Sequence, residues 1–310
     1  MASARLPHED LAAAREAAAL NPRSAPLALA HGEALLRAGE LPEAIAELQR
    51  ALRLDYTFAD ARFVLGCAWL EAGEADKALE SFSHLEEDEE VAPKIAEAHA
   101  MKDRPRSDAG YVRHLFDQFS ADYDERMIGQ LGYQAPQILR ALFDLVMPGR
   151  DELAVLDLGC GTGLTGVVFR DVAARLDGID LSPAMVERAR ARNLYDNLLV
   201  GDIESALDGT TQYDLLLAAD TLVYLGDLEP VFARARRNLR DHGFFLFTVE
   251  SNPSEGFELG PKRRWRHSET YLREQAAKAG FDIAGFMAAV PRHEANRPVE
   301  GFVVALSPGS

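Results

Sequence analysis

The chain has 310 residues, which is long enough for two domains that each bury a core. Its 33 lysines and arginines and 50 aspartates and glutamates give a formal net charge of −17, which disfavours binding to the phosphate backbone of nucleic acid. A hydrophobic share of 47% is typical of globular proteins, and no apolar run has the length of a membrane span. Residues 1–20 lack the uninterrupted apolar core of a secretory signal. We therefore expect a cytoplasmic protein without a membrane or nucleic-acid partner.

An internal repeat of 34 residues occupies residues 25–92. The stretch HGEALLRAGELPEAIAELQRAL (31–52) aligns with LGCAWLEAGEADKALESFSHLE (65–86), so that glycines and large apolar residues fall on one another. The aligned pairs include Gly32 with Gly66, Gly39 with Gly73, and Leu48 with Phe82. The period resembles that of the tetratricopeptide repeat, in which each unit is a hairpin of two helices. A generic amphipathic helix bundle is the alternative.

Segments on both sides of the repeat extend this helical region. Residues 11–22 align with the second helix of a unit, and residues 91–102 have the pattern of a capping first helix. Two complete units are fewer than the roughly three that a free-standing array needs. We therefore expect the array to lean on the domain that follows it; it either binds a protein partner or has a packing or homodimerising role. The acidic run 86–90 predicts a solvated helix end or loop without chemistry.

The polar segment KDRPRSD (102–108) marks a domain boundary, because proline and mixed charge resist the continuation of a helix. We place an all-α repeat domain at 1–105 and a second domain at 106–310. Within the second domain, residues 106–150 show helical spacing with a break near Gly132, and the core follows at 151–310.

The core opens with a buried strand at 153–158 that ends in the glycine-rich turn 159–163. The glycine spacing is G-x-G-x-G, whereas a dinucleotide-binding turn has G-x-G-x-x-G. Asp157 precedes the turn, where a carboxylate would repel a pyrophosphate and attract an ammonium or a sulfonium.

A second acid, Asp180, ends the next apolar strand, 21 residues after Gly159. An acid in this place can accept hydrogen bonds from both hydroxyls of a ribose. Asp180, Ser182 and Pro183 also have the pattern of a helix N-terminus, and this structural role can coexist with ribose binding. The two acids and the glycine turn together favour S-adenosylmethionine as the cofactor.

Strands and helices alternate through the rest of the core. We predict strands at 153–158, 175–180, 197–201, 213–219 and 243–250, each followed by a helix-length segment, which indicates an α/β doubly wound parallel sheet. Residues 281–290 and 299–307 then form two strands joined by the polar loop PRHEANRP without a helix between them. The last strand should therefore be antiparallel to its neighbour.

From about residue 110 onward the chain resembles the class I S-adenosylmethionine-dependent methyltransferases, which have a Rossmann-like sheet. The matching stretches are VLDLGCGTG (155–163), LDGIDLSPAMVERAR (176–190), GDIES (201–205) and YDLLLAADTLVYLGDL (213–228). The combination with N-terminal repeats is similar to a bacterial family of predicted tetratricopeptide-repeat methyltransferases.

The resemblance implies roles for particular residues. The methionine part of the cofactor would meet Asp157 and the turn Gly159, Cys160, Gly161, Thr162 and Gly163. The ribose would meet Asp180, and the adenine would meet Leu181, Met185, Asp202 and Ile203, with Met185 alternatively a core residue. Asp220 follows the fourth strand, beside the expected position of the methyl group. Residues 106–150 would form a helical lid whose motif from Phe116 to Asp124 closes over the cofactor, and Tyr123 and Tyr133 would contact the ligand or belong to the core.

The acceptor is less well indicated. The segment AADTLVYLGDL (218–228) lacks the N/D-P-P-Y/F motif of amide and base methylation, and no set of metal ligands is evident. His267 is a candidate general base or a surface histidine at a helix start, and the basic run 262–266 either attracts an acidic acceptor or is a solvated loop. A small anionic metabolite is the favoured acceptor; a protein substrate delivered by the repeats and an inactive cofactor-binding scaffold are the alternatives. Cys67 and Cys160 should be unpaired, with Cys160 chosen for its small size rather than as a nucleophile.

Overall fold

The computed structural model describes residues 7–103, 106–260 and 263–309. Contacts divide the chain into two compact units, Met1–Arg104 and Pro105–Ser310. The expected boundary, between 105 and 106, lies one residue further along. Of the helices described, none combines the length and the apolar character required to cross a membrane.

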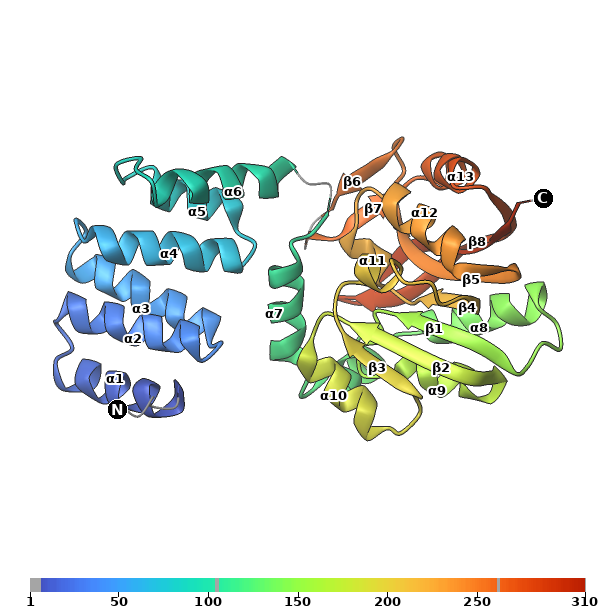
Figure 1. The fold of residues 1–310 in the computed structure, drawn as a ribbon, viewed down its shortest axis with the longest axis horizontal. Coiled ribbons are helices and arrows are strands. Elements are labelled where there is room, and N and C mark those ends of the chain that lie inside the picture. Colours follow the sequence, from blue (N-terminus) through green and yellow to red (C-terminus); the bar gives the residue numbers. More distant parts are fainter. Residues whose placement is uncertain (1–6, 104–105, 261–262, 310) are drawn as a thin grey trace. The chain divides into compact units, whose positions relative to one another are not determined.

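The first unit is a stack of helices (Figure 1). Its helices are α1 (Pro7–Leu20), α2 (Ala25–Arg37), α3 (Leu41–Leu54), α4 (Ala59–Glu71), α5 (Ala75–Phe82) and α6 (Val91–Asp103). The pairs α2–α3 and α4–α5 are the two hairpins that the repeat predicts. Gly39 and Gly73 have φ of +81° and +69°, the left-handed conformation that ends a helix and turns the chain.

The repeat is visible at atomic level in the contact between the paired helices. A Cβ atom on Gly32 would lie 2.8 Å from Leu48 Cγ, and one on Gly66 would lie 2.3 Å from Phe82 Cε1. Both large side chains are fully buried. The glycines are therefore where the two helices of each hairpin approach most closely.

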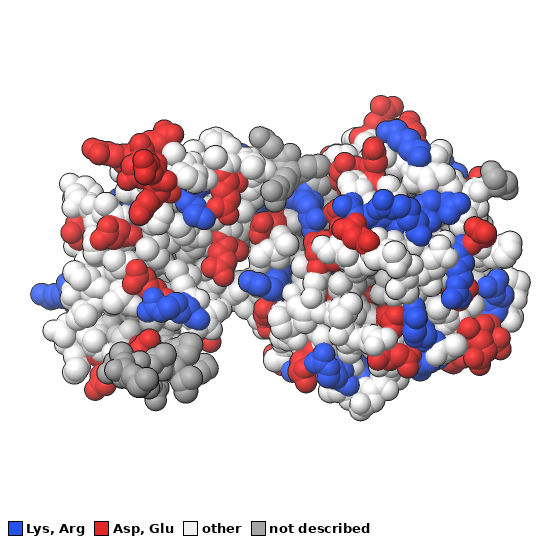
Figure 2. Space-filling view, viewed as in Figure 1, with Lys and Arg blue, Asp and Glu red and all other residues white. Residues whose placement is uncertain are grey.

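The acidic run 86–90 is exposed between α5 and α6, as expected. On the face drawn in Figure 2, acidic side chains gather over this loop. Asp88 accepts hydrogen bonds from the backbone N–H groups of Glu90 and Val91 and so caps α6. These two bonds lower the pKa of Asp88.

The second unit is a twisted sheet with helices on both faces (Figure 1). Its strands are β1 (Leu153–Leu158), β2 (Ala173–Asp180), β3 (Asn197–Val200), β4 (Tyr213–Ala218), β5 (Leu239–Ser251), β6 (Phe257–Leu259), β7 (Trp265–His267), β8 (Phe281–Glu294) and β9 (Arg297–Pro308). The order β3-β2-β1-β4-β5 is parallel throughout. The last strand, β9, pairs antiparallel with β5 and with β8, which confirms the expected reversal.

The helices of this unit connect and cover the strands. They are α7 (Ala109–Phe119), the π-helix η1 (Glu125–Gln130), α8 (Ala135–Val146), α9 (Leu164–Phe169), the 3₁₀ turn η2 (Arg170–Val172), α10 (Pro183–Ala191), α11 (Ile203–Ala206), the 3₁₀ turn η3 (Leu222–Tyr224), α12 (Glu229–Asn238) and α13 (Glu269–Lys278).

The central position of β1 in the sheet explains why residues 153–158 are almost all apolar. Ala154, Leu156 and Leu158 belong to the core on one face of the sheet, whereas Leu153 and Val155 belong to the core on the other. A central strand covered on both faces has no side for polar residues. This burial fixes β1, and hence the glycine turn that follows it.

Three details differ from the expectations. The helix α8 belongs to the sheet core through Leu139, Leu142 and Phe143, so of the expected lid helices only α7 contributes residues to the pocket described below. The strands β6 and β7 interrupt the expected helical connection after β5. The predicted loop 291–298 is mostly strand: β8 continues to Glu294, and the turn consists of Ala295 and Asn296, both with positive φ.

Candidate active site

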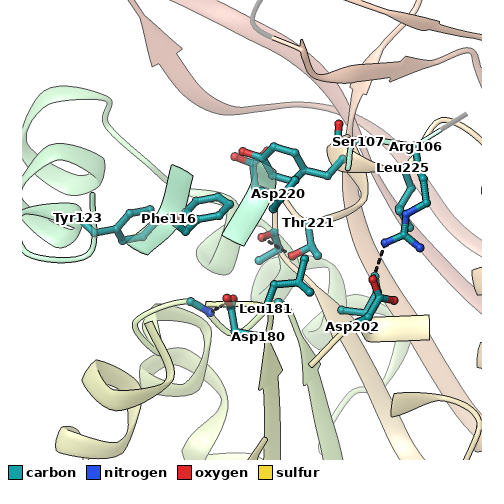
Figure 3. Close-up of a pocket in the computed structure, with 16 residues that line it drawn as sticks. Arg106, Ser107, Phe116, Tyr123, Asp180, Leu181, Asp202, Asp220, Thr221 and Leu225 are labelled. Atoms are coloured by element: carbon teal, nitrogen blue, oxygen red, sulfur yellow. Dashed lines mark hydrogen bonds and ion pairs between the residues drawn. The ribbon is translucent and has the colours of Figure 1, made fainter. Parts of the chain in front are cut away.

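A pocket opens at the carboxyl ends of β1, β2 and β4, the edge where parallel α/β sheets bind ligands (Figure 3). It encloses about 660 Å³, counting the space at its mouth. It is lined by Arg106, Ser107, Val112, Phe116, Tyr123, Gly159, Gly161, Asp180, Leu181, Asp202, Ile203, Ala219, Asp220, Thr221, Tyr224 and Leu225. All of these residues belong to the second unit.

The glycine turn lies against this pocket with left-handed backbone at Gly159, Gly161 and Gly163. The N–H groups of Gly159 and Cys160 both donate to the carbonyl of Ile179, which ties the turn to β2. A Cβ atom on Gly159 would lie 2.4 Å from Thr221 Oγ1. The Thr221 side chain, from the loop after β4, therefore packs directly on Gly159, and only a glycine leaves room for it.

Asp180 lies at the end of β2, 9% exposed, with both carboxylate oxygens engaged. Its Oδ2 accepts from Gly161 N at 2.9 Å, and its Oδ1 accepts from Ser182 N at 2.9 Å. Burial raises the pKa of this carboxyl. Each oxygen keeps a lone pair, so the carboxylate can still accept from two vicinal hydroxyls, as a ribose requires.

Asp157 is fully buried behind the turn and does not line the pocket. Its Oδ2 accepts from the Tyr195 hydroxyl at 2.7 Å, whereas its buried Oδ1 has no hydrogen-bond partner. Burial raises the pKa of Asp157 to about 7, against the opposing effect of Tyr195. An orphaned carboxylate oxygen is a ready partner for an ammonium group. The residues present thus fit S-adenosylmethionine at its amino-acid end.

The adenine side of the pocket contains three of the four expected residues. Leu181, Asp202 and Ile203 line the pocket, but Met185 is fully buried in α10 and is not among the lining residues, which fits its alternative role as a core residue. Asp202 has two partners already: its Oδ1 caps α11 by accepting from Glu204 N, and its Oδ2 lies 2.5 Å from Arg106.

Arg106 is a pocket residue that the sequence does not reveal, because it lies in the polar segment 102–108, which has the composition of a linker. Its guanidinium pairs with Asp202 (Figure 3) and, at 2.8 Å, with Glu204. An isolated β-bridge to Leu225 and a 2.8 Å bond from Ser107 N to the Tyr224 carbonyl hold its backbone. The segment that precedes α7 is therefore part of the pocket wall.

The lid residues are held by two aspartates of the motif from Phe116 to Asp124. Asp117 accepts from the Ser182 hydroxyl at the start of α10, and Asp124 accepts from the Thr162 hydroxyl and pairs with Arg192. Phe116 and Tyr123 line the cavity with their rings 6.1 Å apart. Burial raises the pKa of the Tyr123 hydroxyl.

The remaining expected residues of the turn lie outside the pocket lining. Thr162 is 2% exposed and faces Asp124; Gly163 packs under Arg192 and Tyr195. Cys160 is buried and unpaired, and burial raises the pKa of its thiol, so it supplies no thiolate. Tyr133 also lies outside the lining, and its hydroxyl donates to the Ala219 carbonyl at 3.3 Å.

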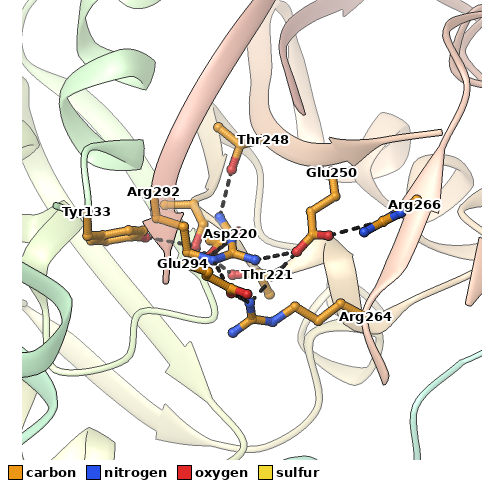
Figure 4. A network of polar contacts seen from close by, with 10 residues as sticks. Tyr133, Asp220, Thr221, Thr248, Glu250, Arg264, Arg266, Arg292 and Glu294 are labelled. Atoms are coloured by element: carbon orange, nitrogen blue, oxygen red, sulfur yellow. Dashed lines mark hydrogen bonds and ion pairs between the residues drawn. The ribbon is translucent and has the colours of Figure 1, made fainter. Parts of the chain in front are cut away.

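Asp220 lines the pocket from the loop after β4, with φ of +57°. Its N–H donates to Thr248 Oγ1 at 2.8 Å, and both carboxylate oxygens pair with Arg292. Arg292 is fully buried and also binds Glu250 and Glu294 (Figure 4). Arg292, which was expected to lie in a polar loop, thus holds the pocket residue Asp220 in place.

His267 does not line the pocket. Its ring is fully buried in β7, where Nε2 lies 3.0 Å from the Gly226 carbonyl and the ring stacks on Tyr271 at 5.8 Å. Burial lowers the pKa of His267 to about 4. This neutral, enclosed imidazole contradicts both expectations, a surface histidine and a general base within reach of the acceptor.

Comparison with known proteins agrees with this geometry. Residues 155–243 match the methyltransferase domain family, and residues 2–55 and 29–89 match the tetratricopeptide repeat. A malonyl-[acyl-carrier protein] O-methyltransferase of Geobacter sulfurreducens is 31% identical over 143 residues, 44% of this chain and 52% of the relative. Human methyltransferase-like protein 27 is 33% identical over 111 residues, 35% of this chain and 43% of the relative.

Solved structures show the same fold. The 1,6-didemethyltoxoflavin-N1-methyltransferase of Burkholderia thailandensis superposes with a TM-score of 0.51 at 20% identity, covering 63% of this chain and 88% of that one. The chain spans about half or less of the length of the curated relatives named above. The second unit therefore contains a methyltransferase domain and has the fold of the class I S-adenosylmethionine-dependent methyltransferases. A tetratricopeptide-repeat array precedes it in the chain.

Proposed function

We propose that this chain transfers the methyl group of S-adenosylmethionine to a small carboxylic acid, on a carboxylate oxygen. The proposal depends on one observation: among the titratable groups that line the described pocket, each carboxylate already has a hydrogen-bond or ion-pair partner, and each tyrosine has a raised pKa. Asp180 is engaged by two backbone N–H groups, Asp202 by Arg106 and Asp220 by Arg292. Burial raises the pKa values of Tyr123 and Tyr224.

A carboxylate acceptor suits such a pocket because it is already deprotonated at neutral pH. A hydroxyl or ammonium acceptor must lose a proton, which calls for a positioned base. A carboxylate needs only to be aligned with the methyl carbon and the sulfur, and alignment alone contributes about 7 to 11 kcal/mol to such reactions. When bound, the cofactor supplies the electrophilic methyl group, and the protein supplies position and charge.

Some of the relatives support oxygen as the acceptor atom. Two of them, from Geobacter sulfurreducens and Salmonella typhimurium, are malonyl-[acyl-carrier protein] O-methyltransferases, at 31% and 30% identity. The basic run adds positive charge next to the pocket: Arg264 interacts with Tyr224, which lines the cavity. Arg263 instead lies over the Tyr111 ring at 4.5 Å, and position 262 is outside the described residues.

A protein acceptor presented through the repeats is the second candidate, favoured by the array itself. The two candidates are separated by incubating the chain and methyl-labelled cofactor with a cell extract fractionated by size. We expect label in the small-molecule fraction, and loss of that label with Asp180→Asn. Label confined to macromolecules would favour the second candidate. Cofactor binding without transfer to either fraction would indicate an inactive scaffold.

A further inference from the structure

A second cavity lies within the methyltransferase unit and shares no lining residue with the first. It is bounded by the end of β5, by β7 and by the β8–β9 hairpin. Its polar lining residues are Glu250, Ser251, Asn252, Arg264, Arg266, Glu294, Arg297 and Glu300. Like the first pocket, it sits at the carboxyl end of a central strand.

Two of its three acids are neutralised from behind. Arg292 is fully buried and pairs with both Glu250 and Glu294, and Arg264 pairs with Glu294 (Figure 4). Arg266 Nε forms a longer ion pair with Glu250 Oε2, at 3.6 Å, and its side chain is 36% exposed. Arg297 and the third acid, Glu300, are both exposed near the turn of the hairpin. Arg266 and Arg297 are therefore the accessible cations of the cavity.

An unsatisfied donor lies in the same wall. Asn252 is 5% exposed, and its Oδ1 accepts from Ser254 N at 3.0 Å, which assigns the other amide atom as Nδ2. That Nδ2 is buried and has no hydrogen-bond partner. A buried amide left without a partner destabilises the fold unless a ligand or water satisfies it.

We propose that this cavity binds an anionic group, a carboxylate or a phosphate, of the methyl acceptor, through Asn252, Arg266 and Arg297. The inference rests on the proposed function, because it takes the ligand to be the acceptor. Arg264 connects the two sites: it lines this cavity and interacts with Tyr224 of the first pocket. An elongated acid would place one group beside the methyl carbon and the other here.

Saturation-transfer NMR on the full-length chain, at constant ionic strength, tests the site without catalysis. The probes are malonate, a carboxylate, and methyl phosphate, so the stronger binder identifies the chemistry. The informative variant is Asn252→Asp, which keeps the acceptor for Ser254 N and loses the donor. A second variant joins Arg266→Ala and Arg297→Ala. We expect each to weaken probe binding at least tenfold.

Two controls keep the outcome specific. Arg273→Ala removes an exposed arginine of α13 that pairs with Glu269 outside the cavity, and probe binding should not change. S-adenosylhomocysteine affinity should be the same in all variants, because the cavities share no lining residue.

A competition experiment connects the cavity to methyl transfer. Malonate at its dissociation constant should suppress label transfer in the cell extract.

The results separate this inference from the proposed function. Probe binding that is absent, or that is unchanged in both variants, overturns the site even if the chain forms methyl esters. Variant-sensitive binding that leaves label transfer unaffected overturns the assignment to the acceptor. Variant-sensitive binding in a chain that forms no methyl ester contradicts the proposed function and leaves the anion site standing.

Discussion

At the scale of single residues, we expect the buried Asp157 to make both stability and cofactor affinity depend on pH. It is fully buried, holds one hydrogen bond from Tyr195, and has one oxygen without a partner. Burial raises its pKa from 3.8 to about 7. In the cofactor-free protein the folded state therefore holds a proton that the unfolded state releases above about pH 4. The stability that this proton contributes is lost as pH rises through 7.

Cofactor affinity should show the opposite trend, because an ammonium group binds the ionised carboxylate. Between pH 6 and 8 the ionised fraction of a group with a pKa of 7 rises about tenfold, and affinity for S-adenosylmethionine should rise accordingly. Calorimetry in buffers of different ionisation enthalpy should also detect a released proton. Asp157→Asn, which keeps the shape, should bind more weakly and without pH dependence. A wild-type affinity that is constant from pH 6 to 8 would argue against this role.

At the scale of secondary-structure elements, the two helix hairpins offer a matched pair of substitutions. Gly→Ala in a helix gains about 1 kcal/mol from propensity, whereas inserting a methyl group into a tight core costs about 1 to 3 kcal/mol. Gly66 faces the rigid, fully buried Phe82 ring, and Gly32 faces the more adaptable Leu48 side chain. Gly66→Ala should therefore destabilise the repeat unit, and Gly32→Ala should do so less.

Chemical denaturation followed by circular dichroism measures the difference. Gly129→Ala is the control, since a Cβ atom there would meet nothing within 4 Å. A Gly66→Ala chain as stable as the wild type would show that the second hairpin does not pack tightly at this glycine, and equal destabilisation by the two substitutions would show that Leu48 yields no more than Phe82.

Elements with a strong local pattern could be predicted from the sequence. The 34-residue period predicted the helix hairpins. The buried strand β1 and its glycine turn predicted the edge of the sheet at which the pocket lies. The antiparallel hairpin was predicted, but its tip at 291–298 was expected to be a loop, because Arg292 and Glu294 are polar residues that long-range ion pairs hold in the strand. Burial by long-range charge pairing leaves no periodic signal in the chain.

The same limit applies to the site. Asp180 follows from its place after an apolar strand, whereas Arg106 lies 96 residues before its partner Asp202, and nothing in its neighbourhood marks it. His267 reads as a helix start, and Ser268 does cap α13, but the short strand β7 draws the imidazole into the core. The burial of His267 is set by tertiary packing, which local sequence patterns do not encode.

At the scale of the whole molecule, the division of labour between the units can be tested by truncation. All residues that line the described pocket follow residue 105. A chain of residues 104–310 should bind S-adenosylhomocysteine within about threefold of the full-length chain, a difference below 1 kcal/mol. A chain of residues 108–310 lacks Arg106 and Ser107 and should bind more weakly. A folded 104–310 chain that fails to bind would show that the repeats complete the pocket.

Methyl transfer to a carboxylate gives a methyl ester, and the lability of this ester in alkali distinguishes it from other methylated products. Methyl esters release methanol in alkali, whereas methyl groups on nitrogen or carbon do not. After incubation of the chain with methyl-labelled S-adenosylmethionine and a small-molecule extract, alkaline treatment should convert most of the transferred label into volatile methanol. The Asp180→Asn chain should give little label of any kind. Transferred label that stays non-volatile in alkali would contradict the account.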